Sequence, residues 1–178
     1  VLGGDSSVFE VLVRRYQDRL FNSLTHLLCN SHEAEEITQD AMLKAFTKLS
    51  TFRGNSSFYT WLYRIALNVN ISRKRRKRPG ISLDEMQLEQ GLEPSGSTNL
   101  PDAHLIQSEQ IAKVHQALAE LSEDFRAVLV LRELDGCDYE TISEMLDIPI
   151  GTVRSRISRG RGLLRNLLQG TLGGSDLP

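Results

Sequence analysis

Residues 139–161, with the sequence YETISEMLDIPIGTVRSRISRGR, decide the fold of the C-terminal part of the chain. Apolar residues at helical spacing predict a short helix, and Pro149, which cannot continue that helix, marks a break before a second one. Ser143 is small where the two helices approach each other. The angle between them would be filled by Ile142, Met145, Leu146, Ile148 and Val153. Two helices joined in this way form a helix-turn-helix, whose second helix enters the major groove of DNA.

The second helix of this motif is strongly positive. Residues 154–161 contain four arginines, at positions 154, 156, 159 and 161, and no acid. A solvated amphipathic helix is the alternative interpretation, but without acids no intrahelical ion pairing accounts for so much positive charge. Arginine can pair with guanine through two hydrogen bonds, and serine can donate to a base or a phosphate. The pattern therefore predicts a DNA-reading surface made of outward-pointing Arg154, Ser155, Ser158 and Arg159.

The rest of the chain also follows helical periodicity. Apolar residues recur at three- and four-residue steps over 9–27 and over 37–49, and a third helix runs from Phe58 into a basic segment that ends at Pro79. Further stripes precede the helix-turn-helix. Because no strand pattern is present, the expected fold class is all-α.

Composition divides this helical chain into two domains. Residues 80–107 are rich in Gly, Pro, Ser and acids, which is typical of a mobile linker. The tail is too short for an added regulatory domain, and Val1 lies so close to a helix start that we expect the chain to be trimmed at this end. The expected limits are 1–79 for the first helical domain, 80–107 for a flexible acidic linker, 108–170 for the helix-turn-helix domain and 171–178 for the tail.

The distribution of charge is more informative than its sum. The 178 residues carry a net charge of −2, which by itself predicts no nucleic-acid partner. Residues 73–78, however, are six consecutive bases, and residues 81–109 contain six acids and no base. Because patches rather than totals steer a protein to phosphate, the basic run is expected to contact DNA. The alternative for this run is a solvated helix end or a localisation-like tract.

Aromatic residues gather just before the basic run. Five of the eleven aromatics lie within residues 52–63. Aromatic faces beside cationic side chains suit single-stranded or melted DNA, because unstacked bases need a surface on which to stack. Trp61 could equally pack the domain core together with Leu62 and Ile65, and the sequence leaves both interpretations open. It also leaves open whether the acidic helix over 33–49 is a solvated face or a docking surface for a basic partner.

Several classes of function are poorly supported. Cys29 and Cys137 show no C-x-x-C spacing, and no zinc pattern joins them to the four histidines, so we expect reduced thiols and no metal. No apolar run approaches membrane-spanning length and no signal peptide opens the chain, so we expect no membrane insertion. The chain has no nucleophile-base set and no phosphate-binding glycine loop with its lysine, so we expect neither an enzyme nor a cofactor.

Four ordered blocks of this sequence closely resemble bacterial extracytoplasmic-function (ECF) sigma factors. The resemblance covers residues 3 to about 168 apart from the linker, which makes it far more specific than a helix-turn-helix alone. The blocks are Gly4-Asp5 with Phe9, Leu12-Val13 and Arg15-Tyr16; AEEITQDAMLKAF at 34–46; FRGNSSFYTWLYRIALN at 52–68; and PIGTVRSR at 149–156.

The resemblance implies a role for each part of the first domain. This domain looks like sigma region 2, which holds core RNA polymerase and opens the −10 element of a promoter. Docking on the clamp coiled coil of the polymerase would use Glu36, Gln39, Asp40 and Lys44. The loop at 52–57 would accept a base flipped from the non-template strand. The −10 element would be met by Phe52, Arg53, Gly54, Asn55, Ser56, Ser57, Tyr59, Trp61, Arg64 and Asn68.

The resemblance extends to the remaining segments. Upstream duplex phosphates would be followed by Arg73, Lys74, Arg75, Arg76, Lys77 and Arg78. The second domain looks like sigma region 4, which binds the polymerase flap, and the acidic linker would run through the polymerase. The −35 element would be read by Thr152, Arg154, Ser155, Arg156, Ser158 and Arg159. Ser158 and Asn55 depart from residues common in the family, so the resemblance does not carry over a promoter sequence.

The expected function is therefore that of a non-enzymatic promoter-specificity subunit in the bacterial cytoplasm, monomeric when free and under the control of an anti-sigma factor. The alternative is a free-standing transcriptional regulator, which usually binds paired half-sites as a dimer without polymerase. A single recognition helix and one phosphate tract offer little area for tight binding alone. This argues for the polymerase-dependent function.

Overall fold

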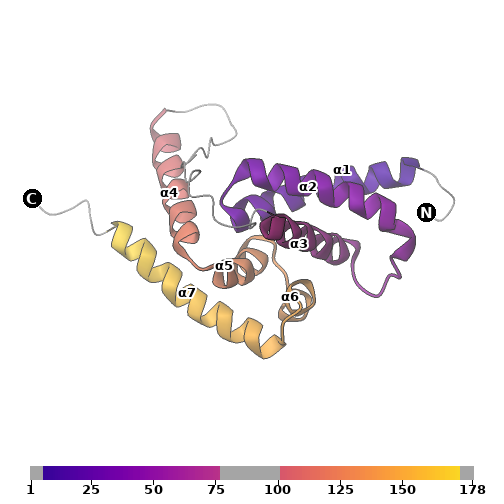
Figure 1. Ribbon diagram of the computed structural model, residues 1–178. Helices are drawn as coiled ribbons and strands as arrows, with labels where there is room; N and C mark the ends of the chain where they lie inside the picture. Colours follow the sequence, from indigo (N-terminus) through magenta and orange to yellow (C-terminus); the bar gives the residue numbers. More distant parts are fainter. Residues whose placement is uncertain (1–5, 77–100, 173–178) are drawn as a thin grey trace, which may run out of the picture. The chain divides into compact units, whose positions relative to one another are not determined.

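The computed structural model describes residues 6–76 and 101–172, and their side chains over 9–76 and 111–170 (Figure 1). The described residues are almost entirely helical and contain no strand, which confirms the all-α prediction. Lys77 and Arg78, most of the expected linker and most of the expected tail lie outside these residues. The chain divides into two compact units, the first built on α1 to α3 and the second on most of α4 to α7.

The first unit is a three-helix arrangement centred on α2. It contains α1 (Ser6–Leu28), α2 (Ser31–Lys48), the short 3-10 turn η1 (Leu49–Thr51) and α3 (Phe58–Arg76), and α2 packs against both α1 and α3. Ile37, Ala41 and Ala45 of α2 are fully buried, as the apolar periodicity predicts. Small alanines at two of these three positions let the neighbouring helices approach closely. The fully buried core around them includes Leu20, Leu24, Leu27, Leu62, Tyr63 and Ala66.

A tight turn joins α1 to α2. Cys29 adopts a left-handed conformation with φ of 54°, and its backbone N–H donates to the carbonyl of Thr25 at 2.9 Å. Asn30 then caps α2, because its Oδ1 accepts a hydrogen bond from the N–H of Glu33 at 2.9 Å. These contacts end one helix and start the next within two residues.

The second unit contains α4 (Pro101–Glu120), α5 (Glu123–Leu129), the π-helical turn η2 (Val130–Leu134), the first part of α6 (Tyr139–Leu146) and α7 (Ile150–Leu172). Helix α7 packs against α4 and α5 around Leu118, Leu121 and Leu129. Helix α4 begins at Pro101, so residues 101–107, which were expected to belong to the linker, are helical. Proline suits the first turn of a helix because the N–H that it lacks would be unpaired there.

Helices α6 and α7 form the predicted helix-turn-helix. Between them Asp147 is left-handed, with φ of 55°. Ser143 closes the turn from both sides, since its hydroxyl donates to the carbonyl of Ile148 at 2.6 Å and its carbonyl accepts from the N–H of Ile148 at 3.2 Å. The small residue noted in the sequence is therefore also the hydrogen-bonding partner that holds the turn.

Candidate functional site

The loop at 52–57 leads from η1 into α3. Gly54 has φ of 73°, a left-handed conformation that favours glycine. Ser57 ends the loop as the cap of α3, because its Oγ accepts from the N–H of Thr60 at 3.0 Å. Arg53 and Asn55, on either side of Gly54, are exposed. The loop thus presents polar side chains and backbone to solvent from a structured base.

Three aromatic rings lie at the base of this loop. The ring centroid of Phe52 is 5.2 Å from that of Trp61 and 5.8 Å from that of Phe58, and Phe58 and Trp61 are 5.6 Å apart. All three side chains are half-buried. Trp61 therefore packs against its neighbours and still keeps part of its side chain at the surface, which is compatible with both interpretations that the sequence left open.

Not every predicted −10 residue is accessible. Arg64 and Asn68 are exposed on α3, but the ring of Tyr59 is buried, with 4% of its surface exposed, and lies under the guanidinium of Arg19 at 4.1 Å. The ring of Tyr59 thus faces the interior of the unit, and its contact with the −10 element stays a prediction. The sequence held a signal for this, since positions 59, 62, 63 and 66 repeat at helical spacing along one buried face.

The described residues of the basic run at the end of α3 differ in their contacts. Arg73 donates from Nε and Nη2 to Oδ2 of Asp40, at 3.1 and 2.8 Å, and from Nη1 to Glu36. The hydrogen bond to Asp40 is the largest cause of a raised pKa for the Arg73 guanidinium. Arg75 and Arg76 are exposed. Arg73 is thus directed toward α2, whereas the two arginines after it are available to phosphate.

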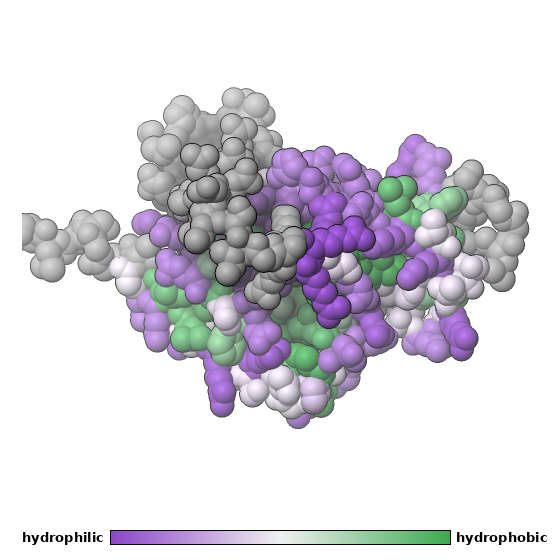
Figure 2. Space-filling model, viewed as in Figure 1, coloured by the Kyte–Doolittle hydropathy of each residue, from purple (hydrophilic) through white to green (hydrophobic). Residues whose placement is uncertain are grey.

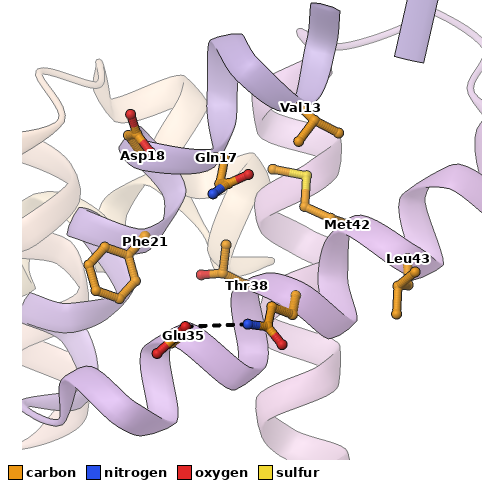
Figure 3. A pocket seen from close by; sticks show the side chains of 9 residues that line it. Val13, Gln17, Asp18, Phe21, Glu35, Thr38, Met42 and Leu43 are labelled. Atoms are coloured by element: carbon orange, nitrogen blue, oxygen red, sulfur yellow. Dashed lines mark hydrogen bonds between the residues drawn. The ribbon is translucent and has the colours of Figure 1, made fainter. Parts of the chain in front are cut away.

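A groove between α1 and α2 adjoins the acidic residues of α2 (Figure 3). Its volume is about 540 Å³, and Val13 and Phe21 of α1 line it together with Met42 and Leu43 of α2. At one end Gln39 donates to Glu35 at 3.4 Å. The predicted docking residues Gln39 and Lys44 are exposed, while Glu36 and Asp40 are partly exposed and paired with Arg73.

Three large apolar side chains of α1 and α2 are exposed, and one of them, Leu43, lines this groove. Leu43 and Phe46 of α2 are 67% and 51% exposed, and Val11 of α1 is 64% exposed. Figure 2 shows hydrophobic residues among hydrophilic ones on the face in view. Sequence reasoning missed this feature, although Leu43 and Phe46 fall outside the buried 37-41-45 periodicity of α2. The helix therefore presents carboxylates and apolar groups together, which a merely solvated face does not require.

The recognition helix α7 divides its arginines into two kinds. Arg156 is half-buried and its Nη2 lies 2.7 Å from Oδ2 of Asp124 at the start of α5, and Arg161 pairs with Glu133 at 2.7 Å. The hydrogen bond to Glu133 raises the pKa of Arg161. Arg154 and Arg159 are exposed and form no ion pair with any residue that the structure describes. Ser155 and Ser158 are also exposed, whereas Thr152 is half-buried.

Both cysteines are free thiols, Cys29 half-buried and Cys137 buried. Within the described ranges, no three His, Cys, Asp or Glu side chains are grouped so that they could hold a metal ion. No helix over those ranges is long and apolar enough to span a membrane.

Comparison with known protein families finds two matches in this chain. Residues 12–79 match sigma-70 region 2, and residues 111–164 match sigma-70 region 4. The ECF RNA polymerase sigma factor SigW of Bacillus subtilis is 37% identical over 93% of this chain and 91% of its own length. The ECF RNA polymerase sigma-E factor of Escherichia coli K12 is 38% identical over 93% of this chain and 89% of its own length.

Solved structures give the same result. The sigma factor RpoE of Bartonella quintana, in complex with the anti-sigma factor NepR, superposes with a TM-score of 0.71 at 25% identity, covering 90% of this chain and 96% of that one. CnrH, in complex with the cytosolic domain of CnrY, has a TM-score of 0.68 at 23% identity over 94% of this chain and 91% of its own, and so supports the fold alone.

Proposed function

The chain belongs to the ECF sigma factors of the sigma-70 family, and on this premise we propose how its residues divide the work of promoter recognition. An ECF sigma factor binds core RNA polymerase and directs it to promoter DNA, where transcription begins. One observation carries the assignment of the second domain. Arg154 and Arg159 are the exposed arginines of the α7 N-terminal half that no acid among the described residues neutralises. Exposed arginines without an acidic partner can form hydrogen bonds with base edges, which suits direct reading of the −35 element.

The loop at 52–57 would receive the flipped −10 base. A base removed from the stack needs a polar group for its pairing edge and an apolar surface for its face. Asn55 and Arg53 would supply the polar groups, and the half-exposed rings of Phe52 and Trp61 would supply the face. Asn68, exposed on α3, would help to read the base, and Arg75 and Arg76 would hold duplex phosphates upstream.

The surface that docks on core polymerase would be the acidic and apolar side of α2. Glu36, Gln39, Asp40 and Lys44 would make the polar contacts, and the groove beside Met42 and Leu43 would receive apolar side chains of the polymerase coiled coil. Interfaces of this kind combine an apolar centre with a polar rim, and the acids favour a basic partner.

Regulation by an anti-sigma protein follows from the comparison with RpoE, which is solved in complex with one. We propose that this chain is held in the same general way, that it acts in the bacterial cytoplasm where polymerase works, and that it has no catalytic activity of its own. Its specificity then resides entirely in the surfaces described above.

Equilibrium binding to purified bacterial core polymerase tests this proposal. We expect saturable binding by the labelled chain, weakened by Leu43→Ala in the groove and unchanged by Ile71→Ala, a comparably exposed apolar residue on α3 (47% exposed). Sequence-specific DNA binding should require the polymerase. Tight duplex binding by the chain alone, with no affinity for core, would instead identify a free-standing regulator.

A further inference from the structure

We infer that helix α1 is part of the nucleic-acid surface, and that Arg15 and Arg19 hold backbone phosphates of the melted promoter strand beside the flipped base. This inference rests on the proposed function and extends its −10 site from the loop and α3 onto α1. It comes from a row of aromatic contacts that joins α1 to the loop at 52–57.

The row of rings begins on α1. Tyr16 lies 5.4 Å from Phe58 and 6.0 Å from Tyr59, measured between ring centroids. Phe58 in turn contacts Phe52 at 5.8 Å, at the start of the loop. Tyr16, Phe58 and Phe52 are all half-buried. Tyr16 of α1 is therefore linked through Phe58 to Phe52, one of the residues that would receive the base.

Two arginines flank this row on α1. The guanidinium carbon of Arg19 lies 4.1 Å from the ring centroid of Tyr59, and that of Arg15 lies 5.6 Å from the ring centroid of Tyr16. Both side chains are exposed. Residues four apart share one face of a helix and are separated by about 6 Å along its axis. A guanidinium resting on a ring keeps its N–H edge directed outward, in the geometry that suits a phosphate.

Among the residues that the structure describes, the exposed Arg15 forms no ion pair. Glu10 pairs with Arg14 at 2.6 Å, and Asp18 lines the groove toward α2. Two further arginines add positive charge beside the rings of Phe52 and Trp61. Arg53 follows Phe52 in the chain, Arg64 lies one helical turn after Trp61, and both are exposed. A purely structural role, in which Arg19 covers the buried ring of Tyr59, would leave the exposed Arg15 without a function.

Single-stranded DNA fits these observations better than duplex DNA. Proteins that bind single strands combine aromatic faces with cationic side chains along the backbone. When one base is flipped into the loop, its neighbours lose their stacking partners, and phosphate contacts fix the register of the strand without reading sequence. Arg15 and Arg19 would supply such contacts.

The test uses reconstituted holoenzyme and a forked promoter probe, in which the non-template strand is single-stranded from the −10 element onward. Arg15→Ala and Arg19→Ala should each weaken binding to this probe roughly tenfold, the loss expected for one charge-assisted hydrogen bond. Each should also make the dependence of log K on log salt shallower by about 0.7, the value for one phosphate of a single strand. Changing the bases of the single strand outside the flipped position should not alter these ratios.

Arg14→Ala is the matched control, because Arg14 lies on the same helix, is exposed and is paired with Glu10. It should leave forked-probe affinity and salt slope unchanged, and all three variants should bind core polymerase as the unaltered chain does. Arg19→Lys keeps the charge while altering the contact with Tyr59, and should retain most of the affinity. Arg15→Ala removes no buried contact, so it tests the inference even where Arg19→Ala lowers the melting temperature.

Forked-probe affinities and salt slopes for Arg15→Ala and Arg19→Ala equal to those of Arg14→Ala would overturn the inference while leaving the proposed function in place. If the unaltered chain failed to bind core polymerase at all, the proposed function would be wrong and this inference would fail with it. The core-binding measurement therefore separates the two failures.

Discussion

Arg73 of α3 holds Asp40 of α2 through two hydrogen bonds, from Nε at 3.1 Å and from Nη2 at 2.8 Å. The same guanidinium also donates to Glu36. Asp40 and Glu36 are two of the four residues proposed to dock on polymerase, and Arg73 opens the basic run proposed to contact DNA. One side chain of the basic run thus orients the docking helix, so we predict that Arg73 is a positioning residue for polymerase docking.

Replacing Arg73 tests this relationship. Arg73→Ala should lower the free energy of unfolding by less than about 1 kcal/mol, because the bridge is partly exposed to solvent. It should weaken core-polymerase binding, since Glu36 and Asp40 lose the partner that fixes their orientation. Arg76→Ala should instead leave core binding unchanged and make the salt dependence of duplex binding shallower by about 0.9. The prediction fails if Arg73→Ala behaves like Arg76→Ala in both measurements.

We predict that some arginines of α7 determine base preference and that another stabilises the fold. Arg154→Ala and Arg159→Ala should each cost about 1–3 kcal/mol of discrimination at one position of the −35 element, with little change in melting temperature. Arg156→Ala breaks the pair with Asp124 at 2.7 Å and should lower the melting temperature more than it changes base preference. Holoenzyme binding to single-base variants of the upstream element, together with thermal unfolding, measures both effects. Equal base preference in all three variants would contradict the division.

Two glycines of α7 provide a matched pair. A Cβ on Gly160 would lie 3.2 Å from Cδ1 and 3.3 Å from Cγ of the buried Leu129, whereas a Cβ on Gly162 would meet nothing within 4 Å. Gly162→Ala should therefore stabilise the protein by about 0.5–1 kcal/mol through helix propensity. In Gly160→Ala, crowding against Leu129 should offset that gain, so the two variants should differ by about 1–2 kcal/mol. Chemical denaturation of both variants measures this difference. Equal stabilisation by the two substitutions would contradict it and would show that Leu129 of α5 moves at little cost.

Acid should weaken the start of the helix-turn-helix. Asp138 caps α6, since its Oδ1 accepts from the N–H of Thr141 at 2.7 Å, and hydrogen bonds from Thr141 lower the pKa of Asp138 below its usual 3.8. A carboxyl with a lowered folded-state pKa contributes stability above pH 3.8 that is lost as the pH falls through the folded value. Asp138→Asn keeps an acceptor but cannot titrate. Its melting temperature should fall less steeply below pH 3.8 than that of the unaltered chain; parallel curves would contradict this role.

The spacing of apolar residues predicted most of the fold, but it did not predict where individual charged side chains point. The helix-turn-helix of α6 and α7 and the buried stripe at Ile37, Ala41 and Ala45 were predictable, because burial of apolar residues fixes helical faces. The pairs Arg73–Asp40 and Arg156–Asp124 join residues 33 and 32 positions apart, and no local pattern reveals them. A run of bases in a sequence therefore predicts positive charge, but not which members of the run are neutralised by the fold.

The most direct test of the central claim is transcription by purified core polymerase on a library of randomised promoters, with and without this chain. We predict initiation only when the chain is present, from templates that share an upstream and a downstream element. With Arg154→Ala/Arg159→Ala, the selected templates should lose the upstream element and keep the downstream one. Initiation that is independent of the chain, or templates whose two elements are both unchanged in the variant, would contradict the account.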